Sequence, residues 1–558
     1  MKKLLLVTLI VGVQITFAGT KVSPDIPTSG GTNVLDVIVQ FQNPPTKNDL
    51  KQLGPYGQIK KQLDIIKGVR LPVSVSAIPG LTKIPGLKYI SPVRPVKRTL
   101  DVTAQTVYAN LAWNFGWDGT GVGVAVIDSG ITPKHDLTGP AGNSRIVYSQ
   151  SFIDGVSDPT DAYGHGTHVA GIIASRGIDS TGPTFSRTFK GVAPGVNLID
   201  LRVLDENGGG QEADVIAAIQ TAIALKNTYN IRVINLSLGR PVFESYTMDP
   251  LCQAVEAAWN AGIVVVTAAG NSGRDNTLGT RGYGTIASPG NDPYVITVGA
   301  SNSHGSSSRY DDTMATYSSK GPTLIDHIVK PDIVAPGNGI VSLLASTSAT
   351  LYRRGTTSVS DAFFSTGNPY YAVSQNYLRL SGTSMATPVV AGAAALLIQK
   401  NPYLTPDQVK ARLMKTAAKT LPRYSVGMDA FTSQSFNNQA DIFTVGAGYL
   451  DINAALANND LATMPALSPM VVYDPTTRHI TLVRIFTNSV VWGDSVVWGD
   501  SVVWGDAIFN GSLKGLSVVW GDSVVWGDNT TTGFSVVWGD SVYLSMLVTA
   551  TSDDDSDQ

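Results

Sequence analysis

One serine in the second half of the sequence has the surroundings of a nucleophile. Ser384 lies within residues 382–388, Gly-Thr-Ser-Met-Ala-Thr-Pro, directly before an apolar run at residues 389–398. Glycine allows a sharp turn and a close approach to a substrate, and the free amides of a helix N-terminus stabilise negative charge. Taken alone, these residues would describe an ordinary helix cap, so the chemical interpretation needs partners elsewhere in the chain.

Two earlier segments contain the partners that a serine nucleophile requires. The apolar run at residues 124–127 ends in Asp128, which predicts a carboxylate at the C-terminal edge of a buried strand. His165 lies between two glycines at the start of a predicted helix of small residues. A serine hydroxyl is a poor nucleophile until an imidazole takes its proton, and a buried carboxylate fixes the tautomer of that imidazole. The three segments therefore supply acid, base and nucleophile.

The order Asp128, His165, Ser384 and the motifs around these residues resemble the subtilisin-like serine proteases. The resemblance covers residues 100–456 and implies an α/β, three-layer fold with a mainly parallel sheet. It also implies peptide hydrolysis through an acyl-enzyme, without a cofactor for catalysis. In the family, the asparagine of an A-A-G-N motif donates a hydrogen bond to the oxyanion, and this role falls to Asn271.

The resemblance further implies a set of substrate contacts. An extended peptide would pair with residues 237–239, while residues 268–270 would wall the main specificity pocket and Ala287 would form its base. Main-chain pairing accepts any extended peptide, and a small uncharged base favours bulky apolar side chains, so a broad endopeptidase with an apolar preference is expected. The substrate-binding positions are Ser237, Leu238, Gly239, Ala268, Ala269, Gly270 and Ala287.

The other polar residues of these motifs receive structural interpretations. His168 follows His165 by three positions, but no cluster of further ligand residues accompanies it, so no metal ligands are assigned and only structural calcium is considered. Asp161 is expected to form a hydrogen bond within its loop, and His135 to lie in a turn.

Apolar runs and helical stretches alternate through residues 100–456, which predicts parallel strands joined by crossover helices. Thr405, Pro406 and Gln408 form a capping-box pattern at the start of another helix. The chain is longer than compact subtilisins between Asn271 and Ser384, and the polar residues 346–375 are expected to form a surface excursion on the active-site side. Strands are expected at residues 197–204 and 232–238, and a further buried strand from residue 263 is expected to end at Asn271. Helices are expected at 211–226 and 250–261.

The N-terminal part predicts export and a zymogen. Residues 1–18 have the charged, apolar and small-residue sections of a secretory signal, and the apolar section is short for a membrane span. Residues 34–98 predict a β-α-β-α-β order with helices at 51–66 and 78–84, which resembles the α+β, ferredoxin-like inhibitory propeptide of the family. Residues 41–100 carry eleven Lys and Arg against two Asp, so they either complement the acidic remainder of the chain or form a solvated basic face.

Composition limits the possible classes of function. With 558 residues, 43% of them hydrophobic, the chain can bury a large core, and a net charge of −3 gives no indication of a nucleic-acid partner. Cys252 is the only cysteine, so no intrachain disulfide can form, and its helical surroundings predict a buried apolar role.

The C-terminal part is repetitive. Ser-Val-Val-Trp-Gly-Asp occurs six times within residues 489–543, which predicts a β-rich repeat region after a linker at 457–488. Residues 544–558 end in an acidic stretch that is expected to be disordered. The repeats would either attach the protein to a surface or polymer or act as a stiff spacer.

Two functions of different classes stay open from these observations. The first is a secreted, extracellular or cell-surface bacterial serine endopeptidase that acts on proteins and peptides and is inhibited by its own propeptide. The second is a cell-surface adhesive or structural protein whose protease-like domain is inert. The complete set of Asp128, His165, Ser384 and Asn271 favours the first.

Overall fold

The chain divides into two units, residues 1–97 and 98–558. The computed structural model describes residues 21–23, 26, 34–93, 102–277, 279–354, 357–365, 373–429, 432–474 and 479–483. The predicted export signal at 1–18, the repeat region at 489–543 and the acidic tail at 544–558 lie outside these residues.

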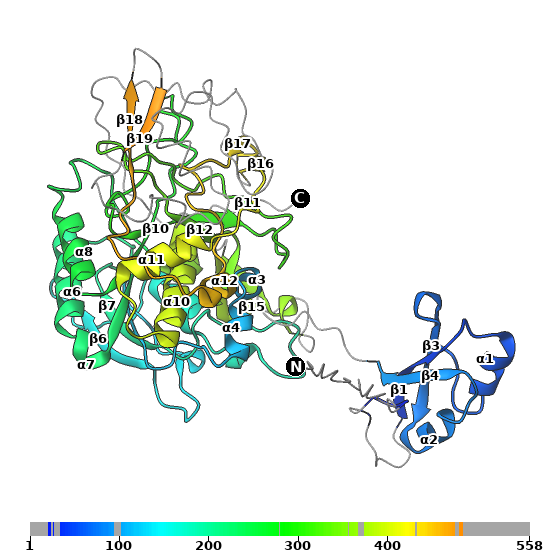
Figure 1. The fold of residues 1–558 in the computed structure, drawn as a ribbon. Coiled ribbons are helices and arrows are strands. Elements are labelled where there is room, and N and C mark those ends of the chain that lie inside the picture. The colour runs from blue at the N-terminus through cyan, green and yellow to red at the C-terminus, as the bar shows by residue number, and fades with distance from the viewer. Residues whose placement is uncertain are drawn as a thin grey trace, which may run out of the picture. The chain divides into compact units, whose positions relative to one another are not determined.

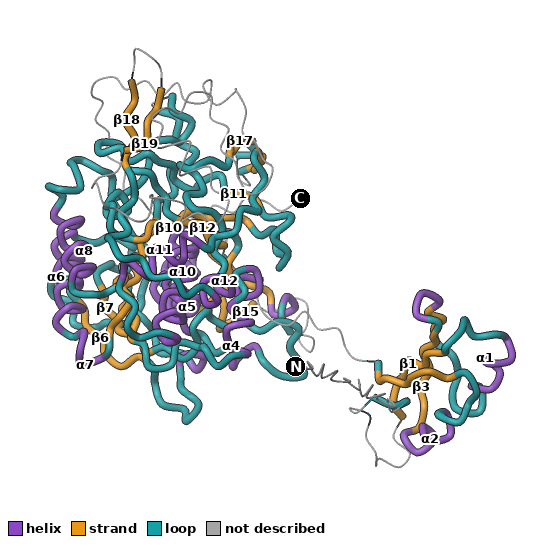
Figure 2. Tube along the Cα trace, viewed as in Figure 1, coloured by secondary structure: helices purple, strands orange, loops and turns teal. Residues whose placement is uncertain are grey.

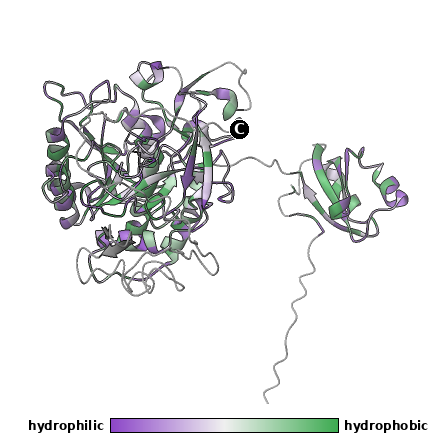
Figure 3. Ribbon diagram, turned by 90° about the horizontal axis from the view of Figure 1, so that it is seen from above, coloured by the Kyte–Doolittle hydropathy of each residue, from purple (hydrophilic) through white to green (hydrophobic). Residues whose placement is uncertain are grey.

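The N-terminal unit is a four-stranded antiparallel sheet with two short helices (Figure 1, blue). Its sheet order β2-β3-β1-β4 places each outer strand antiparallel to an inner neighbour, as in a split β-α-β arrangement. Alternate apolar side chains of these strands form a separate core, and Figure 3 shows the hydrophobic character of the strands. The elements are β1 (Val34–Phe41), α1 (Lys47–Leu53), β2 (Lys61–Leu63), β3 (Gly68–Ser74), α2 (Ile78–Leu81) and β4 (Leu87–Pro92).

One helix of this unit differs from the sequence prediction. The helix expected at residues 51–66 is α1, which begins at Lys47 after a Thr46 capping box and ends at Leu53. Gly54 and Pro55 follow the helix directly, and proline cannot continue it. The residues beyond include β2, a strand of only three residues that pairs with the next strand, β3, in a hairpin.

The C-terminal unit is built around a twisted sheet of eight strands, parallel except for the β10–β11 pair. The order is β11-β10-β9-β8-β5-β7-β6, and β12 pairs with β10. Buried β-branched runs make the central strands, as expected for a parallel sheet covered on both faces. The strands are β5 (Gly123–Asp128), β6 (Ile146–Ser151), β7 (Asn197–Arg202), β8 (Ile231–Leu236), β9 (Val264–Ala268), β10 (Ile296–Asn302), β11 (Thr313–Met314) and β12 (Ile333–Pro336).

Helices cover both faces of this sheet and complete the predicted three-layer α/β fold (Figures 1 and 2). Helices α6 and α8 pack together on one side, whereas α5 and α10 pack together on the other. The capping box predicted at Thr405 is present at the start of α11. The helices are α3 (Val102–Thr106), α4 (Ala109–Asn114), α5 (His165–Ala174), α6 (Glu212–Ala224), α7 (Lys226–Tyr229), α8 (Pro250–Asn260), α10 (Thr383–Lys400), α11 (Pro406–Lys415) and α12 (Ile452–Ala457).

Three small sheets surround the central one. Strands β13 (Ile340–Leu343), β14 (Ser358–Ser360) and β15 (Val373–Leu380) form a sheet in the order β13-β15-β14, and α9 (Thr350–Arg353) precedes β14. The insertion predicted at residues 346–375 includes α9, β14, a 3₁₀ turn at Asp361–Phe363 and the start of β15. The two hairpins are β16 (Tyr424–Met428) with β17 (Ser435–Gln439), and β18 (Met470–Asp474) with β19 (His479–Val483).

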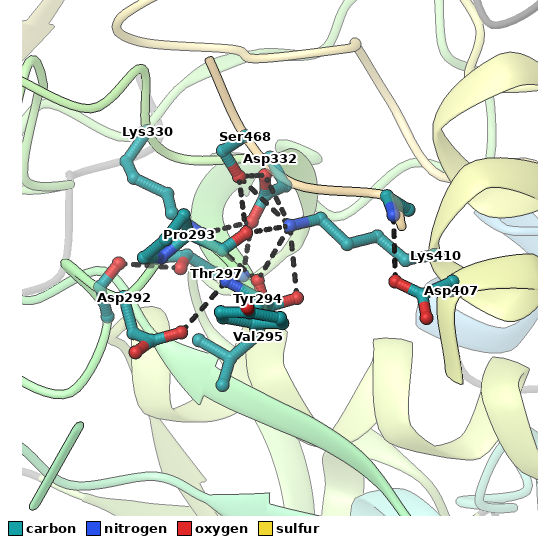
Figure 4. A network of polar contacts seen from close by, with 12 residues as sticks. Asp292, Pro293, Tyr294, Val295, Thr297, Lys330, Asp332, Asp407, Lys410 and Ser468 are labelled. Atoms are coloured by element: carbon teal, nitrogen blue, oxygen red, sulfur yellow. Dashed lines mark hydrogen bonds and ion pairs between the residues drawn. The ribbon is translucent and has the colours of Figure 1, made fainter. Parts of the chain in front are cut away.

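The packed part of the chain continues past Leu456, into residues that the sequence analysis assigns to a linker. Ser468 is fully buried and bonds to Asp332, while Lys410 donates to Ser468 Oγ at 2.9 Å (Figure 4). Lys330 Nζ lies 2.7 Å from Asp332 Oδ2, so two buried lysines share one buried carboxylate. Burial lowers the pKa of Lys410 to about 7, although the negative charge of Asp332 acts to raise it.

Over the described residues, no helix is both long and apolar enough to cross a membrane.

Candidate active site

A buried pair joins the end of β5 to the start of α5. His165 Nδ1 donates to Asp128 Oδ1 at 2.7 Å, and the two side chains are 2% and 0% exposed. Because Nδ1 carries this proton, Nε2 of the neutral ring is an acceptor. Nε2 has no hydrogen-bond partner among the described residues, and it belongs to a side chain that lines a cleft.

A second layer of hydrogen bonds fixes the backbone around this pair. Asp161 accepts from Ser129 Oγ at 2.8 Å and from the amide of Thr167 at 2.8 Å, while Ser129 Oγ accepts from the Gly166 amide at 2.9 Å. A Cβ at position 166 would lie 2.2 Å from the Gly130 carbonyl oxygen, so only glycine allows this approach. Asp161 therefore has the loop role expected from the sequence, whereas its partner Ser129 was not anticipated.

The pKa of His165 reflects burial and neighbouring carboxylates. Burial acts to lower this pKa, but the charge and hydrogen bond of Asp128, with a smaller contribution from Asp161, raise it above its ordinary value. The site thus stabilises an imidazolium, which is the state that His165 would reach after taking a proton.

Ser384 lies in the first turn of α10, and a proline in the same helix changes the bonding of its carbonyl. Pro388 has no N–H to donate to the carbonyl four residues earlier. The Ser384 carbonyl instead accepts from Ser237 Oγ at 2.8 Å. In return, Ser384 Oγ donates to the Ser237 carbonyl at 3.1 Å. The Ser384 hydroxyl is therefore held against the residue that follows β8 in this structure.

The orientation of the Asn271 amide follows from its partners. Its Oδ1 accepts from the Thr383 amide at 2.9 Å and from Thr383 Oγ1 at 3.0 Å. Because a backbone N–H can only donate, the atom facing it must be oxygen, and the NH₂ group is left to point elsewhere. Asn271 and Ser384 line the same cleft, and the Ser384 amide has no acceptor among the described residues. Two donors are thus available beside the serine hydroxyl.

A cleft of about 360 Å³ contains three of the four predicted catalytic residues, His165, Asn271 and Ser384, with Asp128 buried behind the histidine. Six of the seven predicted substrate positions line it, namely Ser237, Leu238, Gly239, Ala268, Gly270 and Ala287. Ala269 does not line the cleft and is fully buried, with its amide and carbonyl in backbone bonds to Val298 and Ala287. The cleft lining also includes residues that the sequence analysis did not single out, among them Tyr163, Leu204, Glu212 and Arg240.

The remaining histidines of the motifs lie in structural positions. His168 Nε2 faces the carbonyl oxygens of Ile340 and Leu378 at 3.1 and 3.2 Å, and burial lowers its pKa to about 3, so the ring is neutral. His135 lies in a short 3₁₀ turn against Asp179. No group of three or more His, Cys, Asp or Glu gathers at metal-binding distances within the described ranges.

Comparison with known proteins identifies the family of this chain. The pattern of the Subtilase family matches residues 119–448. Serine protease AprX of Bacillus subtilis (strain 168) is 37% identical over 393 residues, 68% of this chain and 82% of that protein. Subtilisin DY of Bacillus licheniformis is 34% identical over 61% of this chain and 92% of its own length. A solved cold adapted subtilisin-like serine proteinase is 28% identical, with a TM-score of 0.39 over 59% of this chain and 90% of that one. The chain belongs to the Subtilase family and is a serine endopeptidase.

Proposed function

We propose that Ser384 is the nucleophile of this endopeptidase, His165 its general base and acid, and Asp128 the carboxylate that orients the imidazole. The observation that carries this proposal is the buried 2.7 Å bond between His165 and Asp128, with the opposite ring nitrogen unpartnered beside the cleft that holds Ser384.

In this proposal the hydroxyl of Ser384 turns from the Ser237 carbonyl to His165 Nε2, which takes its proton as Oγ attacks the peptide carbonyl. The imidazolium then gives that proton to the leaving amine, and an acyl-enzyme remains. Water attacks the ester in the second half of the cycle, with the same nitrogen acting as base and then as acid. No cofactor takes part in these steps.

The Asn271 NH₂ group and the Ser384 amide are proposed to donate to the oxyanion. The Thr383 bonds fix the Asn271 amide before substrate arrives, so no reorganisation is needed when charge develops.

The proposed substrates are extended polypeptides with a bulky apolar side chain next to the scissile bond. Residues 237–239 form an edge beyond β8 at which a peptide can add main-chain bonds. Ala268, Gly270 and Ala287 line the cleft with small uncharged surfaces, which leaves room for an apolar side chain.

We also propose that the protein is made as an exported zymogen with residues 34–98 as its inhibitory propeptide. The signal-like composition of residues 1–18 and the four-stranded sheet of the N-terminal unit support this. Residues 489–543 are proposed to serve attachment or spacing outside the catalytic unit, so their deletion should leave hydrolysis of small peptides intact.

Labelling with a fluorophosphonate probe tests the catalytic assignment. The mature protein should be labelled at Ser384, and Ser384→Ala should lose both labelling and casein cleavage while keeping the folded circular dichroism spectrum. Casein cleavage by Ser384→Ala at the wild-type rate would show that another residue is the nucleophile.

A further inference from the structure

The insertion at residues 346–375 lies directly against the loop that carries His165. The amides of Thr350 and Leu351 in α9 donate to the carbonyls of Ala162 and Tyr163 at 3.2 and 3.0 Å. In the same contact, a Cβ at Gly164 would lie 3.2 Å from the Ala349 Cβ. The insertion is therefore fixed beside the site by backbone bonds and close packing.

Tyr163 connects this insertion to the cleft. Its ring lines the cleft, and its centroid lies 6.4 Å from that of His165. Gly208, on the loop after β7, packs so closely that a Cβ there would lie 2.6 Å from the tyrosine ring. Tyr163 is thus held between the insertion and the loop after β7.

Arg354 places a positive charge on the outer side of this tyrosine. Its guanidinium carbon lies 5.8 Å from the Tyr163 ring centroid, and its backbone ends α9 by donating to the Thr350 carbonyl. The side chain is exposed and forms no ion pair with any described residue. Its side chain also hydrogen-bonds to Tyr163. A guanidinium has five N–H donors, so the remaining ones stay available to a carboxylate.

The arginine that lines the cleft itself is in a different state from Arg354, which lies behind Tyr163 and is not part of the lining. Arg240 lines the cleft, but its Nη2 lies 2.9 Å from Glu212, 3.2 Å from Glu244 and 2.9 Å from Asp249. These carboxylates satisfy Arg240, so it cannot offer an unpaired positive charge to a substrate. Arg354 and its neighbour Arg353 are both exposed, and neither has an ion pair among the described residues.

We propose that Arg354 is a specificity-determining residue, which favours peptides with an acidic side chain at the position that passes Tyr163, close to the scissile bond. A carboxylate there would meet a guanidinium held in place by α9 and by the tyrosine ring, at the rim of the cleft where the pair stays hydrated. The proposal rests on the proposed function, since it assumes that His165 acts on the scissile bond.

The test uses peptides that carry Asp, Ala or Lys at one of four positions, the two before the scissile bond and the two after it. At one of these positions, kcat/KM of the wild-type enzyme should favour Asp over Lys by about fivefold at low salt, and by less at high salt. Arg354→Glu should reverse this ratio and Arg354→Gln should abolish it. Arg353→Glu is the matched control, because it makes the same charge change on the adjacent residue, for which no ring contact occurs in the described structure.

Each outcome decides the proposal. The same Asp/Lys ratio in Arg354→Glu as in wild type, or an equal shift in Arg353→Glu, would overturn it. Fluorophosphonate labelling and cleavage of the Ala peptides distinguish failure of the Arg354 proposal from failure of the catalytic assignment. If the wild-type enzyme is labelled but shows no charge preference, only the Arg354 proposal is wrong. If it is not labelled, the catalytic assignment is wrong.

Discussion

Ser237 and Ser384 exchange hydrogen bonds: the hydroxyl of each donates to the carbonyl of the other, at 2.8 Å from Ser237 and 3.1 Å from Ser384. The exchange joins the end of β8 to the first turn of α10. It exists because Pro388 leaves the Ser384 carbonyl without the amide that a regular helix would supply.

Replacement of Ser237 by alanine should therefore reduce stability. The buried Ser384 carbonyl would lose its partner, which costs about 1–3 kcal/mol of unfolding free energy. Urea unfolding measures the effect, and Ser237→Thr is the control because it keeps the hydroxyl. An alanine variant as stable as the wild type would show that the carbonyl finds another donor.

Asn271→Leu should reduce turnover with little change in peptide affinity, because its bond strengthens as the oxyanion forms. The expected fall is about 100- to 1000-fold, the effect known for such a donor in subtilisin. Asn271→Asp keeps the oxygen that faces Thr383 but removes the donor, so it should be impaired as well. Weaker binding with unchanged turnover would assign Asn271 to ground-state recognition.

Activity should rise with pH through a value above 6.5, because His165 must be neutral to act as a base and its pKa is raised by the Asp128 carboxylate despite burial. The pH profile of kcat/KM measures this limb. His135→Gln is the control, since this exposed histidine lies against Asp179 outside the cleft, and it should leave the profile unchanged. A flat profile between about pH 5 and 9 would contradict the assignment of the base.

The same raised pKa has a consequence for stability. His165 binds a proton more tightly in the folded chain than in the unfolded one, because its pKa is raised on folding. The interaction of the imidazolium with Asp128 therefore contributes fully to the free energy of unfolding at pH values below the pKa of the unfolded chain, near 6.5. That contribution is lost as the pH rises through the folded pKa. In Ser384→Ala, which avoids self-digestion, His165→Gln should therefore destabilise more at pH 5.5 than at pH 9.

The wild-type protein should mature to a chain that starts between Val96 and Ala104, whereas Ser384→Ala should keep its N-terminal part. An active protease needs restraint before export, and residues 34–93 have their own core. The isolated 34–98 fragment should inhibit the mature enzyme, more weakly at high salt if its basic residues contribute. Sequencing that finds the same N-terminus in both proteins would assign the cut to another protease.

The parts of the fold with strong local patterns were predictable from the sequence. The apolar run before Asp128 became β5, and Thr405 caps α11 as its motif predicts. Strand β2 was missed because it has only three residues and forms through pairing with β3. The β16–β17 hairpin was missed because its strands are short and only partly buried, so neither forms a clear apolar run.

In the candidate site, too, the residues within local motifs were predictable and the contacts made by the tertiary fold were not. The motifs named the residues that now surround the cleft, but they could not show that Ser129 links Asp161 to Gly166. They also could not place Arg354 beside Tyr163, since nearly two hundred residues separate the two and only the tertiary fold brings them together.

The buried bonds of Ser468 also determine where mechanical load would enter the catalytic unit. Residues beyond β19 connect to the rest of the chain through β18 and then through Ser468, which is bonded to Lys410 and Asp332. A pull on the C-terminal part therefore meets the bond from the Val471 amide to the His327 carbonyl first, and then the bond from the Val329 amide to the Pro469 carbonyl and the Ser468 cluster. The first turn of α10 is spared, so the enzyme could be tethered by its C-terminal end without strain on Ser384.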